Sequence, residues 1–441
     1  MSNKTKKILI MGAGGAGVSN IAQIYKELGH EVIGVDKIRN AATENLEKLG
    51  IPVFDEDEPN ILQGVKMIFK SAAIKYSHPI IHEAKSKRIY IISRYELFEE
   101  LSADRDVIAI AGSSGKTSTT GITAHILKGD RDCGYLIGIH GNGGHNGTHG
   151  DFVLEADEYA KTFLHIKKAK IGLITGLKYD HVDIYPTKEE YDEAFATFAS
   201  RCKTLIINGD DQYLVDKMAQ FKPVTFGKKD SNEWVAKNIM NFEGGSNFDV
   251  YHNGELVTPI TLQVIGGHNI INALAGFVAN YLNGVEVKTI VDQLSVFKGL
   301  PRRLEMIKSN PFYVYDDYAH LPFEIDTVLT GLRESFKARR IICYFQGHTY
   351  TRINAFFVDY TKALSKCDYL LLGDIYAARD AVGSVDLDKM LSMITCKDKV
   401  LSGSVDNTIT LLKTIIKDGD VLVCLNAGDG TKVAQSFKNS K

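Results

Sequence analysis

The sequence has few cysteines, and no two of them are closely spaced. The six, at positions 133, 202, 343, 367, 396 and 424, form no C-x-x-C pair among 441 residues. This spacing argues against a zinc site. It fits free thiols in a reducing compartment, so a cytoplasmic protein is expected.

Long apolar runs and an excess of one charge are absent as well. No run approaches the roughly 20 residues of a membrane span, and glycines interrupt the short run behind the basic N-terminus, so no signal peptide is expected. The formal net charge of −2 argues against a large basic field that binds nucleic acid. We therefore expect small-molecule partners, no nucleic acid, no membrane, and a monomer or weak homo-oligomer.

What the sequence does contain is an α/β pattern long enough for about three domains. Apolar strand-like runs alternate with helical stretches, and polar clusters follow the strands, where open α/β sheets bind their ligands. We predict a Rossmann-like N-terminal domain over 1–104 and a central P-loop-type ATPase domain over 105–299. A Rossmann-like C-terminal domain should cover 300–441.

A phosphate-binding loop is the central feature. The expected strand Val107 to Ala111 leads into Gly112-Ser113-Ser114-Gly115-Lys116-Thr117-Ser118, which opens a helix to about Leu127. Glycines let the backbone approach an anion, and the helix N-terminus offers free N–H groups. Lys116 would reach the β- and γ-phosphates of ATP, and the Thr117 hydroxyl would bind Mg2+. We expect Lys116 to be an exposed loop lysine, so that Lys116→Ala abolishes turnover and leaves the fold intact.

The motif is shorter than the general one, because Ile110 stands where its first glycine belongs. The alternative interpretation is a loop that merely contains Gly-Lys-Thr.

The N-terminal stretch carries a dinucleotide-type fingerprint. A strand from Lys7 to Met11 precedes Gly12-Ala13-Gly14-Gly15-Ala16-Gly17, a helix from about Val18 to Leu28, and a strand that ends before Asp36. The glycines would admit a nucleotide diphosphate at the helix N-terminus. The alternative is a Rossmann-like turn without NAD.

Acidic side chains follow two strands of the central domain. Glu155-Ala156-Asp157-Glu158 comes after the strand Asp151 to Leu154, and Asp180-His181-Val182-Asp183 after the strand Ile171 to Thr175. Such a cluster suits a hard cation at a nucleotide site, with a solvated acidic strand end as the alternative.

The glycine-rich residues 129–150 are expected to be mostly loop. Their histidines, at 140, 145 and 149, are interpreted either as metal ligands or as exposed loop side chains.

Short strands and turns are expected over 221–264, before an apolar helix from Ile270 to about Leu282. Asn269 and Asn272 lie one helical turn apart and should share a face. Asn269 is alternatively only a helix N-cap.

The order of these clusters, with those of the last domain, resembles the Mur ligase family, the ATP-dependent amide-forming enzymes that build the cell-wall peptide. The resemblance covers essentially the whole chain. The matching stretches include Ser71-Ala72-Ala73-Ile74, Glu-Ala-Asp-Glu at 155–158, Asp-His-Val-Asp-Ile-Tyr at 180–185, Gly-His-Asn-Ile-Ile-Asn-Ala at 267–273, Arg-Arg-Leu-Glu at 302–305, Asp-Asp-Tyr-Ala-His at 316–320 and Gln-Gly-His-Thr-Tyr-Thr-Arg at 346–352.

The resemblance implies a ligase whose first domain binds a UDP-sugar, whose middle domain binds ATP and Mg2+, and whose last domain binds an amino acid. The chain is most similar to the branch that joins L-alanine to the carboxylate of UDP-N-acetylmuramate through an acyl phosphate. The catalytic positions matched are Lys116, His181 and Arg303, and the metal positions are Thr117, Glu158 and His181. ATP would also contact Gly112 to Ser118, Asn269, Asn272, Arg303 and Asp317. The UDP-sugar would contact Gly14, Gly15, Ala16, Gly17, Asp36, Ser71 and Ala72. The amino acid would contact Tyr318, His320 and Arg352.

Four residues depart from the family pattern and leave the identities of the UDP-sugar and the amino acid open. Ser114 replaces a histidine, Gly176 an asparagine, Leu321 a second histidine and Gly347 a proline. The alternatives are a related ligase, such as a murein peptide recycling ligase or one for another wall polymer, an NAD-dependent dehydrogenase, and a non-catalytic nucleotide-binding protein.

Overall fold

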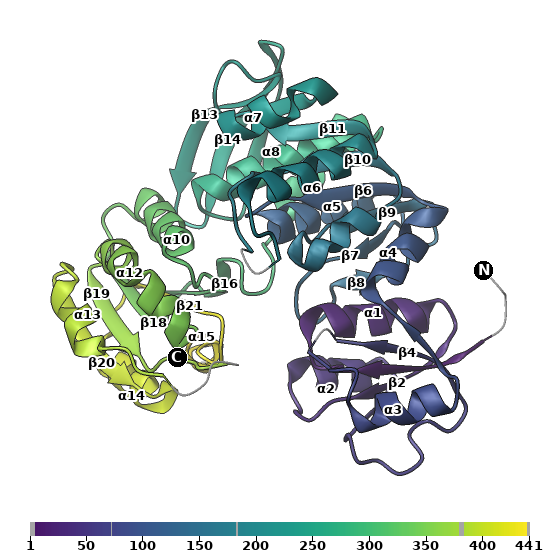
Figure 1. Ribbon diagram of the computed structural model, residues 1–441. Coiled ribbons are helices and arrows are strands. Elements are labelled where there is room, and N and C mark those ends of the chain that lie inside the picture. Colours follow the sequence, from purple (N-terminus) through teal and green to yellow (C-terminus); the bar gives the residue numbers. More distant parts are fainter. Residues whose placement is uncertain (1–4, 72, 182–183, 379–382, 439–441) are drawn as a thin grey trace. The chain divides into compact units, whose positions relative to one another are not determined.

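The α/β fold class is confirmed in a computed structural model (Figure 1), which describes residues 5–71, 73–181, 184–378 and 383–438. Three β-sheets follow one another along the chain, each accompanied by helices. Two compact units can be distinguished. One runs to Ala236 and adds Val250–Thr258 and Asn272–Leu294, and the other contains Lys237–Asp249, Pro259–Ile271 and the chain from Ser295 onward.

The first sheet is parallel and has the strand order β3-β2-β1-β4-β5. This order reverses between β1 and β4, the position at which doubly wound sheets bind ligands. The strands are β1 (Lys7–Met11), β2 (Glu31–Val35), β3 (Val53–Phe54), β4 (Val65–Lys70) and β5 (Tyr90–Ile92). The helices are α1 (Ala16–Glu27), α2 (Ala41–Lys48), α3 (Pro79–Ser86) and α4 (Arg94–Ala103).

The second sheet has ten strands in the order β15-β14-β13-β12-β11-β10-β6-β9-β7-β8. Its strands are β6 (Asp106–Ala111), β7 (Gly134–Leu136), β8 (Gly144–His145), β9 (Asp151–Glu155), β10 (Ala169–Ile174), β11 (Cys202–Asn208), β12 (Val224–Gly227), β13 (Trp234–Phe242), β14 (Gly245–His252) and β15 (Glu255–Leu262). The helices are α5 (Lys116–Asp130), α6 (Lys188–Ser200), α7 (Gln212–Met218), α8 (Gly267–Leu282) and α9 (Val287–Val296), with 3-10 turns η1 (Tyr159–His165) and η2 (Ala219–Phe221).

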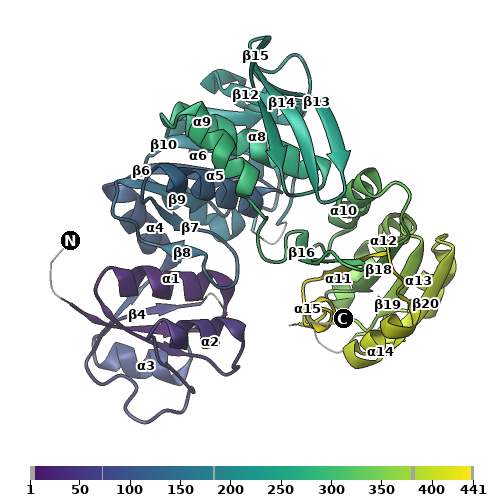
Figure 2. The same ribbon diagram turned by 180° about the vertical axis from the view of Figure 1, so that it is seen from behind.

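The third sheet has the order β16-β17-β21-β18-β19-β20 and is parallel except for its first strand. Figure 2 shows its strands β16, β18, β19 and β20. Its strands are β16 (Glu305–Lys308), β17 (Tyr313–Asp317), β18 (Ile341–Gln346), β19 (Tyr369–Gly373), β20 (Asp398–Gly403) and β21 (Val421–Asn426). The helices are α10 (Pro322–Ser335), α11 (Tyr350–Ala355), α12 (Phe357–Leu364), α13 (Leu387–Met393), α14 (Val405–Ile415) and α15 (Thr431–Ser436).

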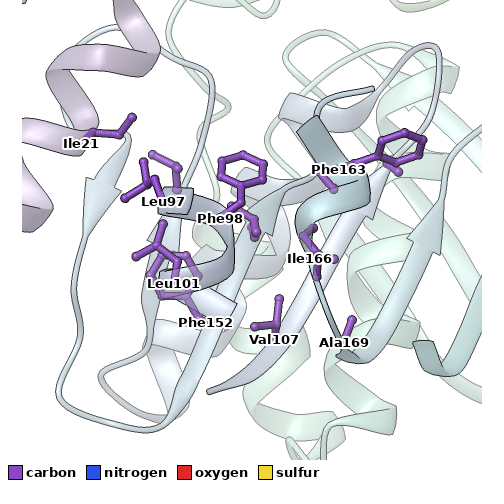
Figure 3. Close-up of a cluster of buried hydrophobic side chains, with 14 of the residues drawn as sticks. Ile21, Leu97, Phe98, Leu101, Val107, Phe152, Phe163, Ile166 and Ala169 are labelled. Atoms are coloured by element: carbon purple, nitrogen blue, oxygen red, sulfur yellow. The ribbon is translucent and has the colours of Figure 1, made fainter. Parts of the chain in front are cut away.

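One hydrophobic core spans the sequence boundary predicted near residue 104. Leu97, Phe98 and Leu101 of α4 belong to the same buried cluster as Val107 of β6 and Phe152 of β9, and Figure 3 shows them side by side. Burial of each such side chain contributes roughly 1.5–3 kcal/mol. The apolar face of α4 therefore joins the first sheet to the second within one compact unit.

The structure corrects several element predictions. Residues 129–150 are mostly loop, as the sequence predicts, but α5 continues to Asp130, and β7 and β8 form an antiparallel pair that was not predicted. Helix α5 passes through Gly129, where a Cβ atom would lie 2.3 Å from the Gln293 side chain, which packs against this glycine. The strands of 221–264 are longer than expected, and β13 was missed; Gly244 and Gly254, both with φ of +87°, provide the turns between them.

No helix within the described ranges is both long enough and apolar enough to cross a membrane.

Candidate active site

The loop between β6 and α5 has the backbone that an anion site needs. Gly112 has φ of +132°, and a Cβ atom there would lie 2.2 Å from the Thr175 hydroxyl oxygen. Gly115 has φ of +80°, and its Cβ would lie 2.8 Å from Oδ1 of Asn272. Both glycines are therefore required by conformation and by space. The helix that follows has 15 residues, and its first N–H groups face this loop.

Lys116 is not the exposed loop lysine that the sequence predicts. It is the first residue of α5, and its side chain is only 16% exposed. Its Nζ donates hydrogen bonds to Oε1 of Glu158 at 2.8 Å and to the carbonyl of Gly112 at 2.6 Å. Burial lowers the pKa of Lys116, but the neighbouring carboxylates of Glu158, Asp157 and Glu155 together outweigh that effect, and the pKa lies above its ordinary value. The lysine belongs to a buried ion pair, which local sequence cannot show.

Glu158 keeps one carboxylate oxygen without a protein partner. Its side chain is 1% exposed, Oε1 receives Lys116, and Oε2 is buried with no hydrogen bond. Burial raises the pKa of Glu158, but attraction to Lys116 and hydrogen bonds from His181 and Lys116 bring it below its ordinary value. A buried anionic oxygen without a donor is costly unless a ligand satisfies it.

Two of the three predicted metal positions, Glu158 and His181, are in contact, and the third, Thr117, bonds to Glu155. Nε2 of His181 is 3.4 Å from Oε1 of Glu158, and the Thr117 hydroxyl donates to Oε1 of Glu155 at 2.8 Å. Over the described ranges, no cluster of three or more His, Cys, Asp or Glu side chains is arranged to hold a metal ion alone. Mg2+ does not need one, because it binds one or two carboxylates and completes its shell with water and phosphate. The orphan oxygen of Glu158 and the Thr117 hydroxyl therefore fit this ion, while a histidine nitrogen suits it poorly.

The histidines of the glycine-rich segment do not gather around a metal site. His145 contacts Glu27 at 2.9 Å and Asp132 at 2.8 Å, and His149 contacts Asp151 at 2.8 Å. For His145 and His149 the metal interpretation is not supported, because their partners form separate ion pairs. His140 has an interaction of its own as well.

Sequence reasoning missed Glu155 as a site residue, although it opens the acidic motif. Its two oxygens accept hydrogen bonds from the Thr117 hydroxyl and, at 2.6 Å, from the backbone N–H of Gly138. The available signal was the spacing of three residues between Glu155, the last residue of β9, and Glu158.

A cavity of about 790 Å³ adjoins the phosphate loop. Ser113, Ser114, Gly176, Lys178 and Asp211 are among its lining residues. Two of the departures from the family pattern, Ser114 and Gly176, therefore open onto the same space. A Cβ atom at Gly176 would meet nothing closer than 3.8 Å, so the cavity has room for a larger residue there.

Asn269 and Asn272 of α8 are both buried, and neither acts as an N-cap. Helix α8 begins at Gly267, which places Asn269 inside the helix, where its Nδ2 donates to the Ile265 carbonyl at 2.9 Å. The N-cap alternative is therefore wrong. Oδ1 of Asn272 lies 3.3 Å from the Thr119 hydroxyl of α5, next to the phosphate loop.

The N-terminal fingerprint forms a tight turn that its own side chains stabilise. Oδ2 of Asp36 accepts the Gly14 N–H at 2.8 Å, and Nδ2 of Asn40 donates to the Gly14 carbonyl at 3.2 Å. A Cβ atom at Gly12 would lie 2.8 Å from Cβ of Ser71, which places Ser71 against this loop. Gly15 and Gly17 belong to the same turn and the start of α1, where Ala16 is the first helical residue. Ala72 lies outside the described residues.

The predicted amino-acid residues of the third domain cluster. The Tyr318 and His320 ring centroids are 5.4 Å apart, and the guanidinium of Arg303 lies 5.5 Å from the Tyr318 ring centroid. Nη1 of Arg352 is 2.9 Å from Nδ1 of His348, whose ring lies 5.6 Å from that of His320. Burial lowers the pKa of His320, which favours a neutral imidazole.

Asp317 supports the backbone around Arg303. Its oxygens accept the N–H groups of Leu304 and Ala319, both at 2.6 Å. Burial raises the pKa of Asp317 to about 6, with Arg303 acting in the opposite direction. Arg302 and Leu304 have φ of +57° and +50°, a left-handed conformation that non-glycine residues adopt at a cost of about 1 kcal/mol or more. Strain of this kind is concentrated at functional sites.

The remaining two departures lie in the same region. Leu321 is at the N-cap of α10 without capping through its side chain, and the Glu324 carboxylate accepts its N–H at 3.0 Å. At Gly347 a Cβ atom would lie 3.0 Å from the Ile353 side chain, so the neighbouring isoleucine occupies space that a larger residue needs.

Family models match almost the whole chain. They are the Mur ligase family catalytic domain over residues 7–106, the Mur ligase middle domain over 110–280 and the glutamate ligase domain over 302–428. The UDP-N-acetylmuramate–L-alanine ligase of Roseiflexus sp. is 33% identical over 97% of both chains. That of Clostridium novyi is 34% identical over 100% of this chain and 99% of its own.

Solved structures show the same fold. The UDP-N-acetylmuramate–alanine ligase of Thermotoga maritima superposes with a TM-score of 0.83 at 24% identity, over 98% of each chain. A murein peptide ligase from Psychrobacter arcticus gives a TM-score of 0.69 at 24% identity, again over 98% of each chain. The chain belongs to the Mur ligase family, with its three α/β domains.

Proposed function

We propose that this protein joins L-alanine to the carboxylate of UDP-N-acetylmuramate in an ATP-dependent reaction of peptidoglycan biosynthesis. The observation that carries the proposal is the buried Lys116–Glu158 pair at the start of α5, with one Glu158 oxygen left without a donor. The names of full-length relatives that are 31–35% identical support this choice of substrates.

In the first step, a carboxylate oxygen of the sugar nucleotide attacks the γ-phosphorus of ATP, and the bond to the bridging oxygen breaks to release ADP. Lys116 and Arg303 would stabilise the negative charge that spreads over the transferred phosphoryl group. Mg2+, held by Thr117 and Glu158, would neutralise charge on the phosphates. The glycine loop would orient the phosphates through its backbone N–H groups.

In the second step, the amine nitrogen of L-alanine attacks the carbonyl of the acyl phosphate. The bond from the carbonyl carbon to the phosphate oxygen breaks, inorganic phosphate leaves, and the nitrogen loses a proton. Arg352 would bind the carboxylate of the amino acid, for which a guanidinium has matching bidentate geometry. His320, kept neutral by burial, would be available to accept a proton near the amine.

The same proposal assigns the remaining parts. Residues 1–104 would bind the UDP-sugar through the Gly14 loop, Asp36 and Ser71. Residues 105–299 would bind ATP, with help from Asn269, Asn272 and Asp317. Residues 300–441 would bind the amino acid. We place the reaction in the cytoplasm, which fits the six free cysteines. We expect a monomer or weak homo-oligomer.

A second candidate is a ligase that adds a ready-made murein peptide. It is favoured by Tyr159, which follows Glu158, is 43% exposed and contacts the His181 ring edge-on at 5.2 Å. An exposed aromatic at this site could pack against a longer substrate.

Phosphate release from Mg-ATP with UDP-N-acetylmuramate distinguishes the two candidates. L-Alanine, L-serine, glycine and a murein tripeptide are supplied in turn. The proposal expects release that requires both the sugar nucleotide and L-alanine. Release only with the tripeptide would support the second candidate, and hydride transfer with NAD in place of phosphate release would contradict both.

A further inference from the structure

A single peptide group, between Ile137 and Gly138, is held at its two ends by different parts of the first compact unit. Its carbonyl accepts a hydrogen bond at 2.8 Å from Nδ2 of Asn20, in helix α1. Its N–H donates at 2.6 Å to Oε2 of Glu155, at the end of β9. The other oxygen of Glu155 accepts the Thr117 hydroxyl at 2.8 Å.

The Asn20 side chain links α1 to the glycine-rich segment through hydrogen bonds. It is fully buried, and besides Ile137 its amide donates to the Ile139 carbonyl at 2.8 Å and accepts the Gly143 N–H at 3.1 Å. These bonds use both amide hydrogens and one oxygen lone pair, which leaves the side chain little rotational freedom.

The glycines of the segment allow this close approach. A Cβ atom at Gly143 would lie 2.3 Å from Nδ2 of Asn20, and one at Gly144 would lie 2.0 Å from the Asn20 carbonyl oxygen. At Gly138 a Cβ atom would lie 3.0 Å from the Glu155 carboxylate. Three of the four glycines in 138–144 are therefore explained by contacts with Asn20 and Glu155, whereas the fourth, Gly141, has φ of +96° and open space around it.

We propose that the hydrogen-bonded chain from Asn20 through the Ile137–Gly138 peptide and Glu155 to Thr117 is a relay that couples binding of the UDP-sugar to binding of Mg-nucleotide. Asn20 and Glu155 act in it as positioning residues. The inference rests on the function proposed above, which places the UDP-sugar at the start of α1 and the nucleotide at Thr117.

The chemistry of the hydroxyl group explains how the relay acts. A threonine hydroxyl that offers a lone pair to Mg2+ must direct its proton elsewhere, and Glu155 is the acceptor of that proton. The planar peptide transmits a shift of α1 directly to Glu155, because its carbonyl and N–H cannot rotate independently. A ligand that fixes the position of α1 thus also fixes Glu155, and with it the direction in which the Thr117 hydroxyl offers its lone pair.

Coupling between two binding sites is reciprocal and can be measured as a ratio of dissociation constants. Calorimetric titration with Mg-ADP, with and without saturating UDP-N-acetylmuramate, gives this ratio for the full-length protein. We expect the sugar nucleotide to tighten Mg-ADP binding by at least about fivefold in the wild type. In Asn20→Ala and in Glu155→Gln the ratio should fall close to one, and the double variant should show no further loss.

Gln23→Ala is the matched control. Gln23 lies one turn further along α1, and its Nε2 donates at 2.6 Å to the Gly141 carbonyl, at the tip of the same segment and away from Gly138. This variant loosens the same contact without interrupting the relay and should keep the wild-type ratio. Glu155→Gln lies outside the contact with α1, so it tests the relay even if Asn20→Ala unfolds.

Three results would overturn the relay. They are a wild-type ratio of one, a full ratio in Glu155→Gln, and an equal loss in Gln23→Ala, which would indicate general loosening. Separate titrations of the wild type with each ligand distinguish failure of the relay from failure of the proposed function. A wild type that binds both ligands without coupling refutes only the relay, and one that binds no sugar nucleotide refutes both.

Discussion

Removing the Lys116 ammonium should destabilise the protein as well as stop its chemistry. Lys116→Ala leaves the Glu158 carboxylate, 1% exposed, without its cation and without the hydrogen bond at 2.8 Å. The sequence alone predicts instead that the fold is indifferent to this change. Stability is therefore the property on which the two views differ.

The size of the effect follows from burial. Removing one partner of a buried ion pair typically costs about 3–5 kcal/mol, because a charge stays behind in a medium of low polarity. The cost is reduced here, since the Lys116 side chain is 16% exposed and His181 lies 3.4 Å from the same Glu158 oxygen. We expect a loss of about 2–3 kcal/mol in the free energy of unfolding. Lys116→Met combined with Glu158→Gln removes both charges and should cost less than Lys116→Ala alone.

Urea unfolding, followed by tryptophan emission, measures this loss. Trp234 is the one tryptophan of the chain and is 1% exposed, so its emission reports on the unit that contains Lys116. Lys128→Ala, at the exposed end of the same helix, is the control; it removes a cation–π contact with Tyr135 at 5.3 Å and should change stability by less than about 1 kcal/mol. A Lys116→Ala variant as stable as this control, or a charge-free double variant less stable than Lys116→Ala, would refute the reasoning.

Three further predictions concern other parts of the molecule. The pKa of Asp317, raised to about 6, lies above that of the unfolded chain, so the buried carboxylate costs stability above pH 6 and this cost is lost as the pH falls. The stability of the wild type relative to Asp317→Asn should therefore rise by roughly 2 kcal/mol from pH 7.5 to pH 4 in denaturant titrations, and a constant difference would contradict the assignment. Arg352→Lys should raise the KM for the amino acid about tenfold in steady-state kinetics with little change in kcat, because a lysine cannot form the bidentate contact; an unchanged KM would remove Arg352 from the site. Gly112→Ala should lower the melting temperature and abolish Mg-ADP binding in calorimetry, because its Cβ would lie 2.2 Å from Thr175. Gly176→Ala is the control and should do neither, because its Cβ would have no contact under 3.8 Å. Equal behaviour of the two variants would contradict the loop geometry.

Local patterns predicted the parts of the site that are local in the chain. The phosphate loop and the N-terminal fingerprint depend on glycines a few residues apart, and both turns form where the sequence places them. The strand Lys7–Met11 has the predicted bounds, because its run of five residues carries the whole signal for a buried parallel strand. The roles assigned to the individual residues remain predictions.

Long-range pairings were beyond the sequence. Lys116 and Glu158 are 42 positions apart, and Asn20 and Ile137 are 117 apart. Nothing in the sequence around Lys116 indicates that another chain segment covers it. Asp36 shows a related difficulty, because its spacing suggests a ligand contact, while in the structure its carboxylate accepts the Gly14 N–H.

The resemblance to the family supplied what periodicity could not, namely the order of the polar clusters and their chemistry. The family models and the full-length relatives bear it out. The burial of Lys116 and the contacts of Glu155 required the coordinates.

The central claim is that ATP activates the carboxylate of the sugar nucleotide as an acyl phosphate, and an isotope-transfer measurement tests it most directly. UDP-N-acetylmuramate labelled with oxygen-18 in both carboxylate oxygens is incubated with Mg-ATP, L-alanine and the protein, and the released phosphate is analysed by mass spectrometry. The account predicts ADP, the amide, and one labelled oxygen in each phosphate, because the attacking carboxylate oxygen leaves with the phosphoryl group. Unlabelled phosphate, or AMP with pyrophosphate in place of ADP, would contradict it.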